Sequence, residues 1–246
     1  GGLLEPLKKK MLCIHKTFET PHENLAFDEA LLLSAESGHL GECLRIWEIE
    51  NHAVVLGSGG ILLDDVNEDA CNKNNVPILR RSSGGGTVLL GKGCLLFSLI
   101  LRTDIRPGLA TIKNSYVNIM EQIANSLGIS GITHDGTSDL AWENKKFSGN
   151  AQQRKSVFIL HHGSILYDFD IGSITEYLKH PVRQPEYRLN RMHQDFLTNL
   201  PIPREEIISR LQTSWKAFDT PPSMPFETMK KLVEEKYELH SWIHRR

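Results

Sequence analysis

The sequence predicts an α+β fold in which one sheet is covered by helices. Strand-like segments dominate the middle of the chain and helix-like segments dominate its end, without the regular alternation that builds a parallel sheet. The length of 246 residues suffices for one large domain or two small ones. Hydrophobic residues make up 40% and charged residues 24%, the balance of a globular protein with its own core.

Apolar spacing predicts the elements of the first third of the chain. Residues 23–37 have the apolar spacing of a helix, and Gly38 is expected to end it. Apolar runs at 44–49 and 53–57 flank Asn51-His52, which predicts a hairpin. The other expected elements here are a strand at 12–18, a short helix at 67–74 and a strand at 77–81.

The same reasoning covers the rest of the chain. Residues 94–102 form a strongly apolar strand, and 112–127 place their apolar side chains near one helix face. Further elements are expected as strands at 139–146 and 157–167, and as helices at 174–179, 204–218 and 226–237. Only 21 residues follow the Pro-rich stretch 219–225, too few for a second domain. We therefore predict one domain over 1–246, with a core at about 11–218, a helical extension at 219–246 and no separate accessory domain.

Composition argues against several functional classes. A net charge of −2 gives no general reason to expect nucleic acid or an anionic membrane as a partner, and no apolar run reaches the roughly 18–20 residues that span a bilayer. The four cysteines include no CxxC pair, so we predict neither a disulfide framework nor a zinc site. A reducing, cytoplasmic location fits best. The chain starts without Met, and an organellar matrix is the alternative if a targeting segment was removed.

The most informative segment is glycine-rich. It reads Arg80-Arg81-Ser82-Ser83-Gly84-Gly85-Gly86-Thr87-Val88 between two strand-like runs. Three glycines leave their amide groups open to an anion or a carboxyl group, and Arg81 offers a planar donor fork suited to either. The alternative is a tight hairpin with unusual backbone angles. The spacing matches neither a P-loop nor GxGxxG.

Two motifs together resemble a known family. RRSSGGGTV is similar to the signature of the lipoate–protein ligase and octanoyltransferase superfamily, which also includes biotin ligases, and it is closer to the lipoate branch. DLAWENKKFSGNA at 139–151 resembles the second signature, a strand followed by a Lys two residues before Ser-Gly-x-Ala. The resemblance runs from about Asn24 to near Phe218. It implies a fold related to class II synthetases, with a mixed, largely antiparallel sheet covered by helices.

The resemblance also implies a set of site residues. Lys146 is implied as the catalytic lysine, with Lys145 as an exposed neighbour. The residues implied to bind the acyl group or the adenylate are Arg81, Ser83, Gly84, Gly85, Gly86, Thr87, Asp139, Ser148, Gly149, Ala151 and His162. The helix starting at Asn24 resembles a family helix with a structural role. Family members often carry a His where this chain has Leu89-Leu90.

Chemistry explains why such a site needs a lysine. A carboxylic acid acylates an amine at neutral pH only after it gains a better leaving group, and forming an acyl-adenylate brings two anions together. A fixed ammonium offsets their repulsion and stabilises the charge that develops. The alternative reading is that Lys145-Lys146 is a solvated turn pair, and that Asp139 merely starts a strand beside Ser138.

His161 and His162 are adjacent in a predicted strand, so their side chains should point to opposite faces and cannot chelate one ion together. The segment resembles the family's His-His-Gly strand, which makes His162 a candidate for the acyl pocket. A purely structural His is the alternative.

A cysteine nucleophile would distinguish the two types of reaction found in this superfamily. The octanoyltransferases of this superfamily hold the acyl group as a thioester on a cysteine. Neither stretch where that cysteine is expected, 129–138 or 157–160, contains one, and Cys94 lies on an apolar strand as a core residue. The resemblance therefore implies an ATP-dependent ligase.

The implied reaction joins lipoate or octanoate to ATP with Mg²⁺, and transfers the acyl group to a lysine of an acceptor. Acceptors would be apo lipoyl domains of 2-oxoacid dehydrogenases or a glycine-cleavage H-type protein. Bacterial ligases commonly carry an accessory domain that is not expected here. Either a separate accessory subunit supplies it, or the protein transfers only a preactivated acyl group. A catalytically silent acyl-binding module and a biotin ligase are the remaining alternatives.

Overall fold

The computed structural model describes residues 10–246, and residues 1–9 of the predicted domain lie outside the described residues. Within this range, eight strands form one large sheet in the order β11-β1-β2-β6-β10-β9-β8-β7. β1 is parallel to both of its neighbours, and every other pair in this sheet is antiparallel. The prediction of an α+β fold with a mixed, largely antiparallel sheet is confirmed. The strands are β1 (Met11–His15), β2 (Cys43–Trp47), β6 (Cys94–Arg102), β7 (Ile132–Asp135), β8 (Asp139–Trp142), β9 (Lys145–Arg154), β10 (Phe158–Leu166) and β11 (Ala217–Asp219).

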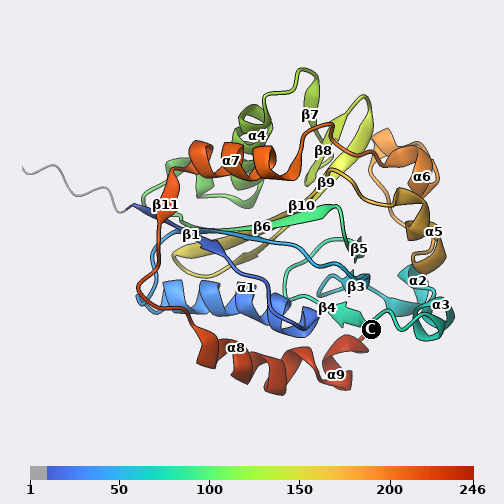
Figure 1. Cartoon of the computed structure of the whole chain (residues 1–246), viewed down its shortest axis with the longest axis horizontal. Coiled ribbons are helices and arrows are strands. Elements are labelled where there is room, and N and C mark those ends of the chain that lie inside the picture. The colour runs from blue at the N-terminus through green and yellow to red at the C-terminus, as the bar shows by residue number, and fades with distance from the viewer. Residues whose placement is uncertain (1–9) are drawn as a thin grey trace, which may run out of the picture.

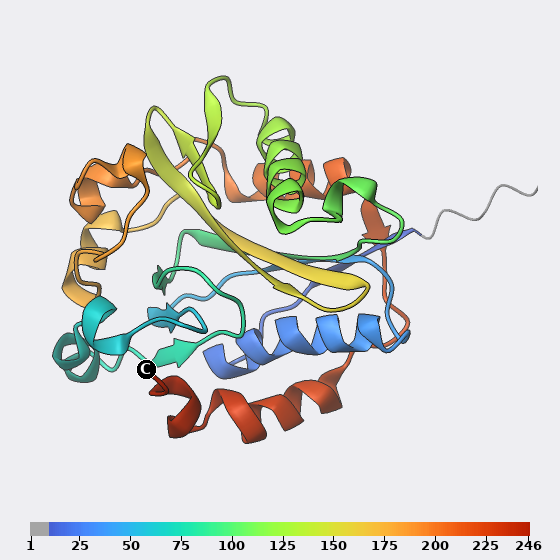
Figure 2. The ribbon, with the colours of Figure 1, turned by 180° about the vertical axis from the view of Figure 1, so that it is seen from behind.

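Helices cover both faces of the large sheet (Figure 1). On one face lie α4 (Ile112–Leu127) and α7 (Arg204–Trp215), which pack on each other over one hydrophobic cluster. On the other lies α1 (Pro21–Glu36), covered in turn by α8 (Phe226–Leu232) over a second cluster. The view from behind shows the same layers (Figure 2). No helix within residues 10–246 combines the length and apolarity needed to cross a bilayer.

A second, small sheet carries the glycine-rich segment. Its order is β4-β3-β5, with β3 (Ala53–Leu56) parallel to β4 (Ile78–Arg80) and antiparallel to β5 (Val88–Leu90). The glycine-rich segment therefore passes from one edge strand to the other, and the alternative of a tight hairpin is wrong. The remaining short helical elements are α2 (Leu62–Asp65), α3 (Glu68–Lys73), η1 (Pro107–Leu109), η2 (Ile171–Ser173), α5 (Ile174–Tyr177), η3 (Glu186–Arg188), α6 (His193–Phe196), η4 (Val233–Tyr237) and α9 (His240–Ile243).

The hairpin predicted from 44–49 and 53–57 is also wrong. β2 pairs with β1 and β6 in the large sheet, whereas β3 belongs to the small one. Both strands are buried along their whole length, so neither shows the alternation of apolar and polar residues that marks a half-exposed strand. The sequence therefore does not indicate which strands they pair with.

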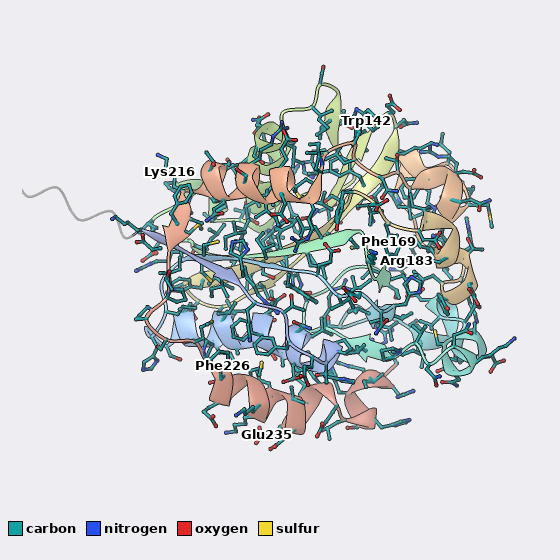
Figure 3. All side chains as sticks on the ribbon, viewed as in Figure 1. Trp142, Phe169, Arg183, Lys216, Phe226 and Glu235 are labelled. Atoms are coloured by element: carbon teal, nitrogen blue, oxygen red, sulfur yellow. The ribbon has the colours of Figure 1, made fainter. Side chains whose placement is uncertain are left out.

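Local backbone chemistry explains several other boundaries. Thr20 and Glu23 form a capping box at the start of α1, and Gly128 ends α4 with a left-handed φ of +66°. The predicted helix 204–218 stops at Trp215 because Lys216 adopts φ +53° (Figure 3), and the chain continues as β11, which was not predicted. The predicted strand 139–146 divides into β8 and β9 at a left-handed Glu143-Asn144 turn. β7 was also missed.

A buried ion pair joins α1 to the large sheet. The guanidinium of Arg45 on β2 donates to Asp28 Oδ1 at 2.8 Å, and both side chains are almost fully buried. The same guanidinium donates to the main-chain oxygens of Lys16 and Asn24. Burial raises the pKa of Asp28, but the charges of Arg45 and the hydrogen bond from His162 outweigh it, so the pKa of Asp28 lies below its ordinary value.

The two histidines of β10 face opposite sides of the sheet, as predicted. His161 is fully buried against Phe97 and Tyr116. Its Nδ1 accepts from the Gln152 amide and its Nε2 donates to Asn150 Oδ1, at 3.0 and 2.9 Å. Burial lowers the pKa of His161 to about 3. This ring is a neutral part of the core.

We predict that Arg45→Met lowers the free energy of unfolding by about 3–5 kcal/mol, because it leaves the Asp28 carboxylate buried without its cation. Urea denaturation measures this. The double variant Arg45→Met/Asp28→Leu should recover most of the loss. The control is Arg102→Met, whose partner Asp104 is solvent-exposed and whose loss should cost less than about 1 kcal/mol. Equal losses for Arg45→Met and Arg102→Met would contradict the prediction.

A second prediction concerns pH. Since His161 has a native pKa of about 3, the unfolded chain binds the extra proton between pH 6.5 and 3, and stability must fall as the pH falls through that range. His161→Gln should flatten the decline in unfolding free energy measured by urea titration between pH 7 and 5. The exposed His39→Gln serves as the control and should keep the wild-type slope. Identical slopes for His161→Gln and wild type would refute this assignment.

Candidate active site

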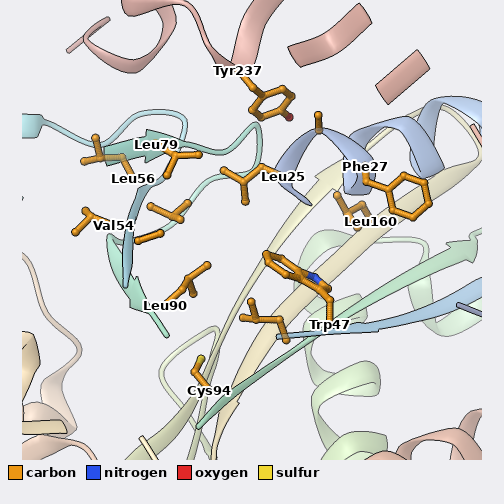
Figure 4. Close-up of a cluster of buried hydrophobic side chains, with 14 of the residues drawn as sticks. Leu25, Phe27, Trp47, Val54, Leu56, Leu79, Leu90, Cys94, Leu160 and Tyr237 are labelled. Atoms are coloured by element: carbon orange, nitrogen blue, oxygen red, sulfur yellow. The ribbon is translucent and has the colours of Figure 1, made fainter. Parts of the chain in front are cut away.

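A cavity of about 120 Å³ lies between the glycine-rich segment, α1 and strands β9 and β10. Part of its wall is apolar, and Figure 4 shows Leu25, Trp47 and Leu90 converging from α1, β2 and β5. The rest of the wall is polar. The lining residues are Leu25, Asp28, Trp47, Val55, Arg81, Gly86, Thr87, Val88, Leu90, Leu96, Ser138, Asp139, Lys146, Gly149, Asn150, Ala151, His162, Gly163 and Ser164.

Arg81 shapes the glycine-rich segment from within. Its buried guanidinium donates to Ser83 Oγ and to the main-chain oxygens of Gly84 and Gly86, at 3.1, 2.6 and 2.8 Å. Burial lowers the pKa of Arg81 to about 10. The donor fork that we expected to face a ligand is thus largely occupied by the turn that it stabilises. The turn also needs Gly57, because a Cβ there would lie 2.1 Å from the Gly85 oxygen.

A chain of hydrogen bonds ties the same turn to the large sheet. Asp28 Oδ2 accepts from His162 Nδ1 at 2.9 Å, and the Ser83 hydroxyl lies 2.5 Å from His162 Nε2. Because ionised Asp28 can only accept, Nδ1 of His162 carries a proton, and in the Nδ1–H tautomer Nε2 accepts from the Ser83 hydroxyl. The array orients Ser83, which is itself buried beneath the turn.

Lys146 stands in the polar part of the wall. Its Nζ lies 3.1 Å from Asp139 Oδ1, and its side chain is 26% exposed. A Cβ on Gly149 would meet that Nζ at 3.1 Å, so glycine leaves the ammonium its space. A bulge in the β8–β9 register leaves Phe147 unpaired and buried in the core, next to Lys146 in the cavity wall.

Asp139 is held from its other side by Tyr187. The Tyr187 hydroxyl donates to Asp139 Oδ2 at 2.8 Å. Burial and the Asp139 charge raise the pKa of Tyr187 well above its ordinary value, so the hydroxyl stays protonated and keeps donating. Asp139 is thereby fixed between a cation and a hydroxyl.

The structure brings most of the predicted residues to this cavity. Those that line it are Arg81, Gly86, Thr87, Asp139, Lys146, Gly149, Ala151 and His162. Four others stand behind or beside the wall: Ser83 and Ser148 are buried, with hydrogen bonds to His162 and Asn150, while Gly84 and Gly85 are exposed in the turn. Lys145 is exposed, as expected.

Sequence reasoning missed several residues of the site, above all Asp28. It assigned the first helix a structural role, yet Asp28 lines the cavity. A signal was present: Asp28 follows Leu25 by three residues and precedes Leu32 by four, so it lies on the apolar face of α1. A carboxylate at a core position is costly unless paired, and marks a functional candidate. Trp47, Asn150 and Tyr187 gave no comparable signal.

Thiol groups contribute nothing to this wall. All four cysteines lie among the described residues, and none lines the cavity. Burial raises the pKa of Cys13 to about 11 and those of Cys43 and Cys94 further. Cys94 is a core residue, as predicted. Across residues 10–246, no group of three His, Cys, Asp or Glu is placed to hold a metal ion.

Comparison with known structures supports the fold. A bi-partite lipoate protein ligase of Thermoplasma acidophilum, described with its E2 lipoyl domain, superposes with a TM-score of 0.79 at 21% identity, over 95% of this chain and 97% of that one. A lipoate-protein ligase A bound with ATP gives a TM-score of 0.80 at 20% identity, over 96% and 98%. The expected class II synthetase-like fold is confirmed.

Sequence relatives divide between two activities. A probable lipoate-protein ligase A of Mycoplasma pneumoniae is 32% identical over 64% of this chain, which spans about half (46%) of that relative. The octanoyltransferase LipM of Clostridioides difficile is 30% identical, over 69% of each chain. LipM of Bacillus cereus is 24% identical over 97% of this chain and 99% of its own length.

The profile of one family also matches, over residues 20–212, well over half of the chain. The match contains both the glycine-rich segment and Lys146 with its strand. The protein therefore belongs to the lipoyl protein ligase A/B catalytic domain family, whose enzymes are lipoate ligases and octanoyltransferases.

Proposed function

We propose that this protein is a lipoate–protein ligase that activates lipoate or octanoate with ATP and transfers the acyl group to a lysine of a lipoyl-domain acceptor. The observation that carries the proposal is the Lys146–Asp139 pair in the polar part of a cavity whose opposite part is lined by apolar side chains such as Leu25, Trp47 and Leu90. An apolar wall suits an alkyl tail, and a fixed ammonium suits the anionic end of an activated acyl group.

The activation step needs two anions to meet. A carboxylate oxygen attacks the α-phosphorus of ATP, a new P–O bond forms, and pyrophosphate leaves with the electrons of the broken bond. Lys146 Nζ, oriented by Asp139, would offset the combined negative charge. Mg²⁺ would be held mainly by the phosphates of ATP, which leaves one or two carboxylates at most for the protein to supply.

The transfer step needs an acceptor amine in its neutral form. Its nitrogen attacks the acyl carbon, a C–N bond forms, the bond to the phosphate oxygen breaks, and AMP leaves. The nitrogen loses its surplus proton to solvent. The glycine-rich turn offers main-chain amides without side chains to block the approaching carbonyl. The absence of any cysteine from the described cavity wall supports direct transfer over a thioester relay.

A second candidate is transfer from a preactivated acyl donor without ATP. It is favoured by the similarity to octanoyltransferase LipM over nearly the whole of both chains. The acceptor is proposed to be an apo lipoyl domain in either case, in line with the E2 lipoyl domain described with the Thermoplasma acidophilum ligase. A glycine-cleavage H-type protein is the other acceptor to test.

The decisive assay measures acceptor modification by intact mass. The protein and an apo lipoyl domain are incubated together in three parallel tubes, each with a different acyl donor. The donors are lipoate or octanoate plus Mg-ATP, lipoyl-AMP, and the octanoyl thioester of a carrier protein. We expect a mass gain with free acid and ATP. A gain with lipoyl-AMP alone would indicate a transferase or a ligase that needs an accessory subunit. A gain only with the thioester would replace the ligase by an octanoyltransferase, and no gain in any tube would leave an acyl-binding module.

A variant pair tests the role of Lys146. Lys146→Ala should lower the acyl-transfer rate constant by about 100- to 1,000-fold, because it removes a preorganised charge from the reacting centre. Lys145→Ala is the matched control: this neighbouring lysine is exposed and should be dispensable. Rates come from single-turnover mass spectrometry, with circular dichroism to compare folding. Equal rates for the two variants would exclude Lys146 from the chemistry.

A further inference from the structure

The turn that forms the cavity wall is contacted from two sides. Arg80 ends β4 and the chain bends at Ser82 and Ser83, yet the contacts of successive side chains in 80–83 alternate between two sides. Arg81 lines the cavity, and Ser83 bonds to His162, which also lines it. Arg80 and Ser82 point the other way, toward the C-terminal segment 226–246, defined here as the brace.

Ser82 is held by two residues of the brace. Its Oγ lies 2.5 Å from the Tyr237 hydroxyl and accepts from Lys236 Nζ at 2.8 Å. The Tyr237 hydroxyl in turn donates to Glu29 Oε1 at 3.1 Å, so it must accept from Ser82. Lys236 also pairs with Glu29 at 3.1 Å. Burial raises the pKa of Glu29, but the hydrogen bonds and charges of Gln153 and Lys236 leave it below its ordinary value.

Arg80 is held by the same segment. Its guanidinium is fully buried and donates to the main-chain oxygens of Trp242 and Ile243, while Trp242 Nε1 donates back to the Arg80 oxygen at 2.8 Å. Further donors of the same guanidinium reach the oxygens of Gly57 and Gly60. The brace thus contacts the chain at Arg80, the last residue of β4, and at Ser82, the two residues on either side of Arg81. Figure 1 shows its last helix, α9, beside β4.

We infer that the brace is a positioning element of the acyl-adenylate site, and that Tyr237 acts on it through Ser82. The inference rests on the proposed function, because it presumes that the cavity binds an activated acyl group. The brace residues do not line the cavity. They set the rotation of residues 80–83, and with it the direction in which the following amides and the Ser83 hydroxyl face.

The chain offers conservative variants. Tyr237→Phe removes only the hydroxyl and keeps the buried ring, and Ser82→Ala removes its partner. Tyr167→Phe is the matched control, because that hydroxyl also donates to a glutamate, Glu48, at 2.8 Å, away from the turn. The probe is a non-hydrolysable lipoyl-sulfamoyl adenosine, and its dissociation constant is measured by titration calorimetry on the full chain.

We expect Tyr237→Phe and Ser82→Ala each to raise the dissociation constant by about 3- to 10-fold, the worth of one hydrogen bond expressed as affinity. The double variant should lose less affinity than the sum of the two single variants, because both remove the Ser82–Tyr237 hydrogen bond. The KM for lipoyl-AMP should rise in parallel while kcat stays within about two-fold of wild type, as expected for lost uniform binding. Tyr167→Phe should leave both unchanged.

The possible outcomes distinguish a failure of the positioning role from a failure of the proposed function. If wild type binds the probe and Tyr237→Phe binds it equally well, the positioning role is refuted and the proposed function stands. Additive losses in the double variant would also refute it, because Tyr237 would then act by another route. If wild type itself fails to bind the probe, the proposed function falls and the positioning role falls with it.

Discussion

The structure depends on one buried ion pair, Arg45 with Asp28. It fastens α1 to the large sheet, and it helps to hold the pKa of Asp28 below its ordinary value in a place where burial alone would raise it. An ionised Asp28 sets the tautomer of His162, and His162 then accepts from Ser83 in the glycine-rich turn. The buried charge of Asp28 therefore helps to position the glycine-rich turn through His162 and Ser83.

Sequence patterns predicted the parts of the fold that local physics determines. The apolar strand 94–102 and the helix 112–127 emerged with the bounds expected of them. Sequence patterns failed where the place of a strand depends on the distant strands with which it pairs. β2 and β3 are buried on all sides and look alike in sequence, yet they belong to different sheets. β11 is three residues long and exists only because β1 offers it an edge.

The same division applies to the candidate site. Lys146 and the glycine-rich turn were recognisable because their chemistry is written in consecutive residues. Asp28, Trp47 and Tyr187 reach the site from distant segments, and only the folded chain brings them together. Arg81 is an intermediate case: its position was predicted, but most of its hydrogen bonds go to the turn. The sequence indicates which residues reach the cavity more readily than it indicates what they contact.

The contact between Gly57 and Gly85 has a consequence for how such sites diverge. Two turns that lie 28 positions apart touch so closely that a Cβ on Gly57 would meet the Gly85 oxygen, and Gly85 itself needs glycine for its φ of +93°. A change in the shape of one turn must then be matched in the other, and in the Arg80 guanidinium that bonds to the Gly57 oxygen. Homologous recombination that separates these turns would join mismatched halves, so the two are expected to be inherited as one module.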